Sequence, residues 1–284
     1  MPRSSPTTSL ANPPAVDGGL TMRPAGTPRL ELEEIVSTYE EGAQRLTALE
    51  GLSLQVAETE FVALVGPSGS GKSTLLDIVA GLITQDSGAI RLNGQLTTAE
   101  QRLGQSAYMQ QRDLLLPWRT TTGNAALGLE ASGMSRSDAE QRAVTELWRF
   151  GLDGFGDAYP AQLSGGMRQR AAFLRTILPR KDLVLFDEPF GALDALTRSD
   201  LQAWLVGLWE QERSSVLMVT HDVEEAVFLA DRVIVLTPRP GRVAFELTVS
   251  LPRPRTRSMI ASPEFIRDRA TLLQALGLLG APQP

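Results

Sequence analysis

The sequence FVALVGPSGSGKSTLL at residues 61–76 decides the fold of this chain. Its five apolar residues at 61–65 predict a buried β-strand, and residues 66–73 match the pattern G-x-x-x-x-G-K-S/T. Glycines let the backbone curl so that its N–H groups point at an anion, and the helix predicted over 73–80 adds its positive N-terminus. The sequence therefore predicts a nucleotide-phosphate site made of Gly66, Pro67, Ser68, Gly69, Ser70, Gly71, Lys72, Ser73 and Thr74.

Two side chains of this loop have separate expected roles. Lys72 should reach the β- and γ-phosphates, and the Ser73 hydroxyl should bind Mg²⁺. A glycine-rich turn without a ligand would not need Lys72, so a purely structural turn is the weaker interpretation. A nucleotide with its phosphates bound to Mg²⁺ is therefore the expected ligand of this loop.

A pair of acids follows a second apolar run. Residues 183–186 read LVLF, which is typical of a buried parallel strand, and Asp187 and Glu188 come next. The carboxyl end of such a strand lies at the same sheet edge as the phosphate loop. Asp187 is expected to hold Mg²⁺, directly or through water, and Glu188 to polarise the attacking water as general base. An acid pair of this kind is often only solvated, but the phosphate loop favours the functional interpretation.

Residues 163–170 read LSGGMRQR and lie between these two motifs. Ser164, Gly165 and Gly166 stand where a helix is predicted to start, which makes a second anion site or simply a capped helix. With the motifs in this order, the chain resembles the ATP-binding subunit of ABC transporters over roughly residues 30–255. The resemblance implies that each ATP is held between the phosphate loop of one chain and residues 164–166 of another.

The resemblance also places four further residues. Tyr39 matches an aromatic that stacks on adenine, with a strand-packing tyrosine as the alternative. Gln111 matches the glutamine of the Q-loop, with Gln110 as runner-up, and Asp194 matches a loop that crosses to the other subunit. His221 is the chain's one histidine and matches the residue that hydrogen-bonds the γ-phosphate. The implied catalytic residues are Glu188, His221 and Lys72, and the implied metal ligands are Ser73, Gln111 and Asp187.

Alternating strand and helix patterns predict an α/β fold with a parallel sheet. The resemblance implies a P-loop NTPase with a RecA-like parallel-sheet core, an antiparallel β subdomain and a helical subdomain at about 112–165. We expect a disordered tail over 1–28, the ATP-binding domain over 29–250, and a Pro/Arg-rich extension with a terminal helix over 251–284. Its arginines are expected to form a solvated face or to lie near anionic lipid head groups: Arg253, Arg255, Arg257, Arg267 and Arg269.

Composition excludes several other classes of protein. The 284 residues contain no cysteine and one histidine, which rules out a disulfide scaffold, a thiol nucleophile and a His-cluster metal site. The net charge of −6 argues against a nucleic-acid binder. No run of 18 apolar residues predicts a membrane span, and the N-terminus lacks the apolar segment of a secretory signal.

The resemblance implies a head-to-tail homodimer that closes on ATP at the cytoplasmic face of the membrane. Its further partners would be membrane-spanning permease subunits and, through them, a periplasmic or extracellular solute-binding protein. The apolar segment LLLPW at 114–118 would contact the permease, with packing inside the helical lobe as the alternative for individual leucines.

Three stretches are similar to the importer group for nitrate, sulfonates and taurine: LLLPWR at 114–119, DEPFGALD at 187–194 and RPGR at 239–242. The form of residues 108–116 and 168–176 leans toward the branch for hydroxymethylpyrimidine, a thiamine precursor. A soluble ABC-type ATPase without transport is the alternative, and a binding module without turnover is a third interpretation. The short spacing between Lys72 and Ser164 argues against a soluble ABC-type ATPase. The presence of both Glu188 and His221 argues against a binding module without turnover.

Overall fold

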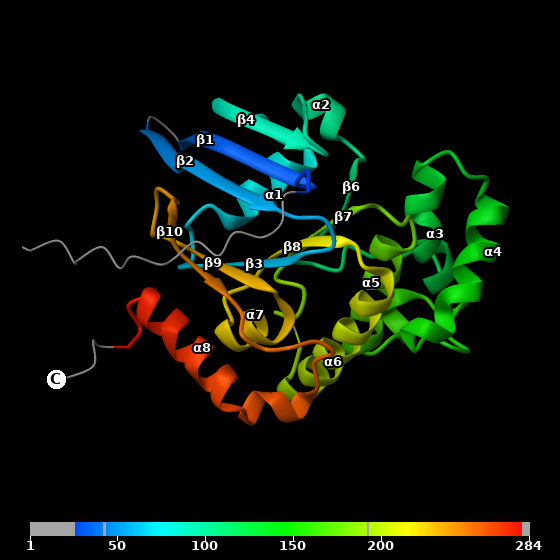
Figure 1. The fold of residues 1–284 in the computed structure, drawn as a ribbon. Helices are drawn as coiled ribbons and strands as arrows, with labels where there is room; N and C mark the ends of the chain where they lie inside the picture. Colours follow the sequence, from blue (N-terminus) through cyan, green and yellow to red (C-terminus); the bar gives the residue numbers. More distant parts are fainter. Residues whose placement is uncertain (1–25, 42–43, 192, 280–284) are drawn as a thin grey trace, which may run out of the picture.

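The computed structural model describes residues 26–41, 44–191 and 193–279, so the tail expected over 1–28 lies almost wholly outside the described residues (Figure 1). The strands are β1 (Leu30–Glu41), β2 (Gln44–Val56), β3 (Phe61–Val65), β4 (Ser87–Leu92), β5 (Gln95–Leu96), β6 (Ser106–Met109), β7 (Leu183–Asp187), β8 (Ser215–Val219), β9 (Arg232–Leu236) and β10 (Val243–Thr248). The α-helices are α1 (Lys72–Ala80), α2 (Ala99–Arg102), α3 (Thr121–Ala131), α4 (Arg136–Glu146), α5 (Gly165–Ile177), α6 (Ala195–Glu212), α7 (Val223–Leu229) and α8 (Pro263–Ala275). Short 3₁₀ helices are η1 (Leu147–Phe150), η2 (Pro160–Gln162) and η3 (Arg257–Ala261).

A parallel sheet forms the centre of the molecule. Within the described residues its order is β10-β9-β3-β8-β7-β6, and only the edge strand β10 runs antiparallel to its neighbour. Alternate residues of β3 face opposite sides: Phe61 and Ala63 join the cluster packed on α5, α6 and α7, whereas Val62 and Leu64 join the cluster packed on α1. Because both faces are covered, all five residues of β3 are apolar and buried.

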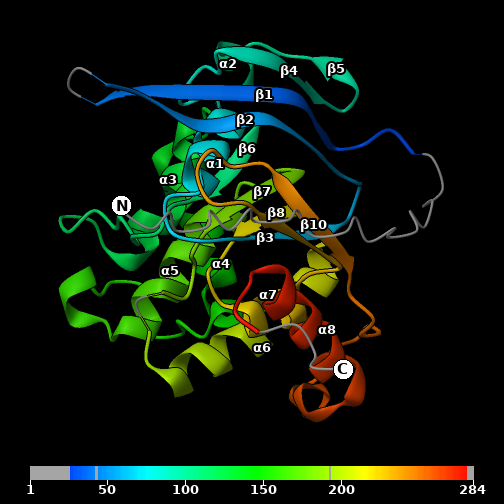
Figure 2. The same ribbon diagram turned by 90° about the vertical axis from the view of Figure 1, so that its left-hand side faces the viewer.

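A second, antiparallel sheet covers α1 from the other side. Its order among the described residues is β2-β1-β4-β5, and apolar side chains of β1 and β2 share a core cluster with α1 and β3. Figures 1 and 2 show α1 lying between the two sheets, so its N-terminus is enclosed by both. This arrangement confirms the predicted α/β class with a parallel-sheet core, an antiparallel β layer and a helical part.

The helices α3 and α4 project to one side of the sheets, as Figure 1 shows. They lie in the part of the chain where a helical subdomain was expected, and buried alanines such as Ala125, Ala139 and Ala143 let them pack closely on each other and on α5. The loop between β6 and α3 therefore joins the central sheet to this helical lobe.

Two strands of the parallel sheet have weak sequence signals. β6 has only four residues, and β10 is an edge strand whose residues are all at least partly exposed. Neither contains the long apolar run that predicts a strand buried on both faces. Neither strand was therefore predicted from the sequence.

The expectation for the arginines of the C-terminal extension is wrong for two of them. The Arg253 guanidinium lies 4.0 Å from the ring centre of Trp209, and its Nε is 2.8 Å from Asp231 Oδ1. Arg255 is buried and donates from Nη1 to the carbonyls of Val227, Phe228 and Ala230. These two side chains pair with core groups because the extension folds back under α7. Arg257, Arg267 and Arg269 are exposed, as a solvated face requires.

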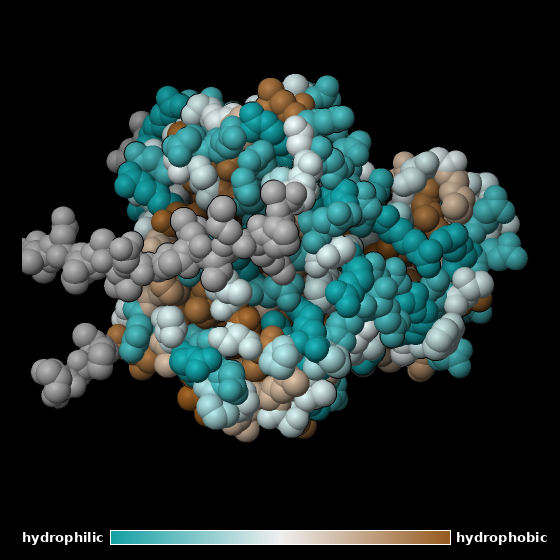
Figure 3. Space-filling view, viewed as in Figure 1, coloured by the Kyte–Doolittle hydropathy of each residue, from teal (hydrophilic) through white to brown (hydrophobic). Residues whose placement is uncertain are grey.

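One face of the surface is shown in Figure 3. On the face in Figure 3 hydrophilic residues predominate and apolar residues form small separate groups. Among the helices that the structure describes, none combines the length and the apolar character needed to cross a membrane.

Candidate nucleotide site

The loop between β3 and α1 forms one wall of a pocket of about 220 Å³. Lys72 is the first residue of α1, and its Nζ donates to the carbonyls of Gly66 and Pro67 at 2.8 Å each and to Ser70 Oγ at 3.3 Å. The loop thus wraps around the Lys72 side chain. The residues that line the pocket are Tyr39, Ala48, Ser68, Gly69, Gly71, Lys72, Ser73, Thr74, Glu188 and Arg239.

Gly71 shows why this loop needs glycine before the lysine. Its φ is +87°, and a Cβ there would lie 2.7 Å from Leu49 Cδ2 and 2.8 Å from the Ala48 carbonyl oxygen. Any other residue would therefore strain the backbone and push against β2. The close approach leaves the backbone N–H groups at the start of α1 free of a side-chain cap, which suits an anion.

Two charged groups at the centre of the site have shifted pKa values. Burial lowers the pKa of Lys72, although the charges of Glu188 and Asp187 act in the opposite direction. Burial raises the pKa of Asp187, and its hydrogen bond with Ser73 opposes that rise. The Ser73 hydroxyl and the Asp187 carboxylate are therefore neighbours in a low-dielectric site, and both are the hard oxygen donors that Mg²⁺ prefers.

Glu188 contacts two other predicted site residues, Gln111 and His221. Its Oε2 accepts a hydrogen bond from Gln111 Nε2 at 3.0 Å and lies 3.2 Å from His221 Nδ1. Its backbone has φ of +44°, and its N–H donates to the Val219 carbonyl at 2.9 Å, which anchors this turn to β8. The structure thus brings Gln111, not its neighbour Gln110, onto Glu188.

Tyr39 lies at the mouth of the pocket near the end of β1. Its hydroxyl bonds to Thr74 Oγ1, and 40% of the residue is exposed. The ring is presented at the pocket edge, where a flat ligand could contact it.

The other predicted nucleotide contacts lie outside this pocket in their own chain. Ser164 caps α5 by accepting from the Met167 N–H at 3.2 Å, and Asp194 caps α6 by accepting from Leu196 and Thr197 at 3.1 and 3.0 Å. Ser164, Gly165, Gly166 and Asp194 are absent from the described pocket lining. A Cβ on Gly166 would lie 2.8 Å from Thr197 Cγ2, so these two helix starts pack against each other.

The loop after Gln111 is held by α5. Arg175 donates from Nη1 to the Leu114 carbonyl at 2.7 Å and from Nη2 to the Asp113 carbonyl at 2.5 Å. Leu115 is buried, whereas Leu114 is 50% and Trp118 is 72% exposed. The apolar segment therefore divides, with one leucine in the core and two large side chains presented to solvent.

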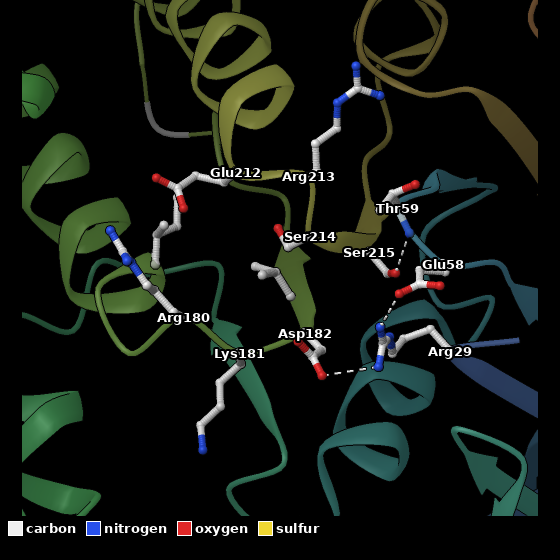
Figure 4. Close-up of a pocket in the computed structure, with 12 residues that line it drawn as sticks. Arg29, Glu58, Thr59, Arg180, Lys181, Asp182, Glu212, Arg213, Ser214 and Ser215 are labelled. Atoms are coloured by element: carbon white, nitrogen blue, oxygen red, sulfur yellow. Dashed lines mark hydrogen bonds and ion pairs between the residues drawn. The ribbon is translucent and has the colours of Figure 1, made fainter.

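A second pocket lies at the opposite edge of the parallel sheet, at the amino ends of β3, β7 and β8 (Figure 4). Arg29 crosses it and pairs with Glu58 and Asp182 at 3.0 Å each. The long side chains of Lys181 and Arg213 point away from each other in Figure 4, and the Arg29 guanidinium is already paired with the two carboxylates. None of the predicted site residues lies in its described lining.

Arg239 is a charged residue in the described lining of the nucleotide pocket that sequence reasoning missed. It comes from the loop between β9 and β10, and its Nε donates to the Gly69 carbonyl at 3.2 Å. The stretch RPGR at 239–242 was the available signal, but it pointed only to a group of relatives. The contact joins residues 170 positions apart in the sequence, which no local pattern reports.

Residues 49–191 match the sequence profile described as ABC transporter. The chain is 42% identical over 227 residues to the taurine import ATP-binding protein TauB of Rhizobium johnstonii, covering 78% of this chain and 86% of that protein. It is 41% identical over 243 residues to the formylaminopyrimidine import ATP-binding protein ThiZ of Halalkalibacterium halodurans, covering 86% and 92%. The chain belongs to the ABC transporter family.

Solved structures agree with this assignment. The dimeric structure of MJ0796, a bacterial ABC transporter cassette, has a TM-score of 0.69 and 31% identity, covering 77% of this chain and 98% of that one. A dimeric post-hydrolysis state of the same cassette contains ADP and phosphate. This chain is thus an ABC ATP-binding subunit and an ATPase.

Proposed function

We propose that this chain powers the import of a small solute by hydrolysing ATP in a head-to-tail homodimer bound to permease subunits. The observation that carries the proposal is the convergence of Gln111 and His221 on Glu188 Oε2, at the end of a pocket that also contains Lys72. A structural ion pair would not need all four groups beside a phosphate loop.

The absence of residues 164–166 from the described pocket lining of their own chain supports the dimer. Residues 164–166 start α5 and stand outside the described pocket lining of their own chain, so a second copy would bring them over the nucleotide. The Ser164 N-cap leaves further N–H groups of α5 available to the γ-phosphate of the partner's ATP. Asp194 would contact the partner from the start of α6.

Glu188 would accept the proton of the attacking water while His221 and Lys72 stabilise the charge that develops on the γ-phosphate. Gln111 donates its amide N–H to Glu188, which leaves its amide oxygen free to join Ser73 and Asp187 in holding Mg²⁺. When bound, Mg²⁺ would neutralise charge on the phosphate oxygens. Tyr39 would stack on adenine and so fix the register of the nucleotide in the pocket.

Contact with the membrane complex would use the loop after Gln111. Leu114 and Trp118 are exposed in the loop that follows Gln111, the residue that contacts Glu188. Arg175 holds this loop against α5. A displacement of Leu114 and Trp118 by the permease would therefore be transmitted to Gln111 and, through α5, to the start of that helix. In this proposal the subunit would lie at the cytoplasmic face of the membrane, would reach the solute-binding protein through the permease and would not bind nucleic acid.

For the solute, the relatives named for taurine and formylaminopyrimidine import support either an organic sulfonate or a pyrimidine. Uptake of labelled taurine and of labelled formylaminopyrimidine by cells with and without this chain would distinguish the two. Loss of neither uptake would refute both solute assignments. Unchanged growth on all such solutes, together with intact ATPase activity, would favour a soluble ATPase outside transport.

The test of the composite site is the rate of Mg²⁺-dependent ATP hydrolysis per chain at increasing protein concentration. We expect the rate per chain to rise with concentration, and Glu188→Gln to lower turnover by roughly 10²–10⁴-fold while trapping an ATP-bound dimer. Ser164→Arg should block dimer closure but leave ATP binding by the monomer intact. A rate per chain independent of concentration would overturn the two-chain site.

A matched control is Glu224→Gln. Glu224 is also close to His221 in sequence, but it is 53% exposed and pairs with Arg269 at 2.9 Å. It should turn over like the parent. Equal turnover by the parent and Glu188→Gln would overturn the general-base assignment.

A further inference from the structure

Arg239 stands in the wall of the nucleotide pocket, between the adenine side and the phosphate loop. Its Nε donates to the Gly69 carbonyl at 3.2 Å, and its Nη2 lies 3.4 Å from the position that a Cβ on Gly69 would occupy. Tyr39 and Ser68 line the same pocket. The guanidinium is therefore beside the phosphate loop, with its outer N–H groups still available.

The loop that carries Arg239 is fixed against the phosphate loop. The Gly241 N–H donates to the Ala48 carbonyl at 2.8 Å, and its own carbonyl accepts from the Glu50 N–H at 3.2 Å. A Cβ on Gly241 would lie 2.1 Å from the Ser70 carbonyl oxygen, so this close approach requires glycine. Arg239 is thus held in position by backbone contacts on both sides of the pocket.

The charge of Arg239 is also uncommitted within the chain. Among the described residues no carboxylate makes an ion pair with it, whereas Arg242 in the same loop donates to Glu50 Oε2 at 2.6 Å. The Gly69 carbonyl uses one N–H of the five on the guanidinium. A planar cation with free donors beside a phosphate loop suits a phosphate oxygen.

We propose that Arg239 is a further nucleotide-binding residue that contacts the α- and β-phosphates. The γ-phosphate side of the pocket is defined by Glu188 with Gln111 and His221, and the base side by Tyr39. Arg239 bonds to the stretch of loop between them, whose N–H groups cradle the α- and β-phosphates in loops of this pattern. Because ATP and ADP share these phosphates, Arg239 would bind both equally.

The experiment measures Kd for ATP and for ADP in parent and variant chains. Arg239→Ala should weaken both by about tenfold, the effect of one charge-assisted contact. At saturating ATP, kcat should stay within about twofold of the parent, because the contact is equal before and during cleavage. The inference rests on nucleotide binding at this pocket, which the parent chain's own Kd tests independently.

Arg239→Gln separates binding of phosphate from support of the loop. The glutamine Nε2 occupies the position of the arginine Nε, so the bond to the Gly69 carbonyl can persist while the charge is lost. We expect Arg239→Gln to weaken binding as Arg239→Ala does, and Arg239→Lys to recover part of it. Arg242→Ala is the matched control and should bind like the parent.

Four results would overturn the proposal. Parental affinity in Arg239→Gln would mean that the side chain only supports the loop. A loss of affinity confined to ATP would indicate that Arg239 contacts the γ-phosphate instead. An equal loss of affinity in Arg242→Ala would indicate that only the general positive charge of this loop matters. A drop in thermal midpoint shared by the alanine and glutamine variants, with unchanged Kd, would also count against it.

Discussion

Replacing Arg255 by methionine tests whether the C-terminal extension is part of the folded ATPase. Arg255 is 6% exposed, and its Nη1 serves the carbonyls of three residues at the end of α7, the helix that follows His221. Methionine has similar length but no donors. The substitution therefore leaves three buried acceptors without this partner and removes a buried cation at the same time.

These two effects oppose each other. Each lost bond from a charged donor costs about 1.5–3 kcal/mol. Burial, together with the nearby charge of Arg253, lowers the pKa of Arg255 to about 10, which corresponds to about 3 kcal/mol of unfavourable charge burial that methionine relieves. Nη1 has two N–H groups shared among the three carbonyls, so their loss costs about 3–6 kcal/mol, and we expect Arg255→Met to reduce the free energy of unfolding by about 1–2 kcal/mol after that relief.

Urea unfolding at neutral pH, followed by tryptophan fluorescence and by circular dichroism, measures this difference. Arg267→Met is the control, because Arg267 lies on α8 with a side chain that is 62% exposed and should change stability by less than about 0.5 kcal/mol. If Arg255→Met unfolds within that same margin of the parent, the three bonds are not a net stabilising contribution and the reasoning fails.

Two more substitutions test particular site residues. Gln111→Ala should lower ATP turnover by at least about tenfold, because Gln111 contacts Glu188 at 3.0 Å, whereas Gln110→Ala should turn over like the parent; the opposite ranking would reassign the Q-loop glutamine. Asp187→Asn should raise the thermal midpoint of the nucleotide-free chain at pH 7, since burial raises the pKa of Asp187 and makes its ionised form unfavourable there. A folded-state pKa above the unfolded value means that the native state binds the extra proton, so stability is lost as pH rises through that pKa. The stabilisation by asparagine should therefore vanish on acidification toward the unfolded value, and a difference independent of pH would contradict this.

The local motifs were readable from sequence because their chemistry is local. The phosphate loop needs glycines, Lys72 and Ser73 within a few residues, and β3 and β7 are buried on both faces, so their residues form unbroken apolar runs. Asp187 and Glu188 follow directly from the end of β7. These stretches determine the parallel sheet, the nucleotide class and the general-base candidate before any contact is known.

Contacts between distant segments were decided only by tertiary structure. Sequence left Gln110 and Gln111 as alternatives, and the approach to Glu188 across 77 positions selects Gln111. Arg239 contacts Gly69, 170 positions away in the sequence. From the sequence alone Arg255 resembles a surface arginine, and only the fold brings it against α7. Side-chain identity sets what a group can donate, accept or carry as charge, but burial and partners depend on which segments the fold brings together. In the proposed dimer, residues 164–166 would extend the same principle to a second chain.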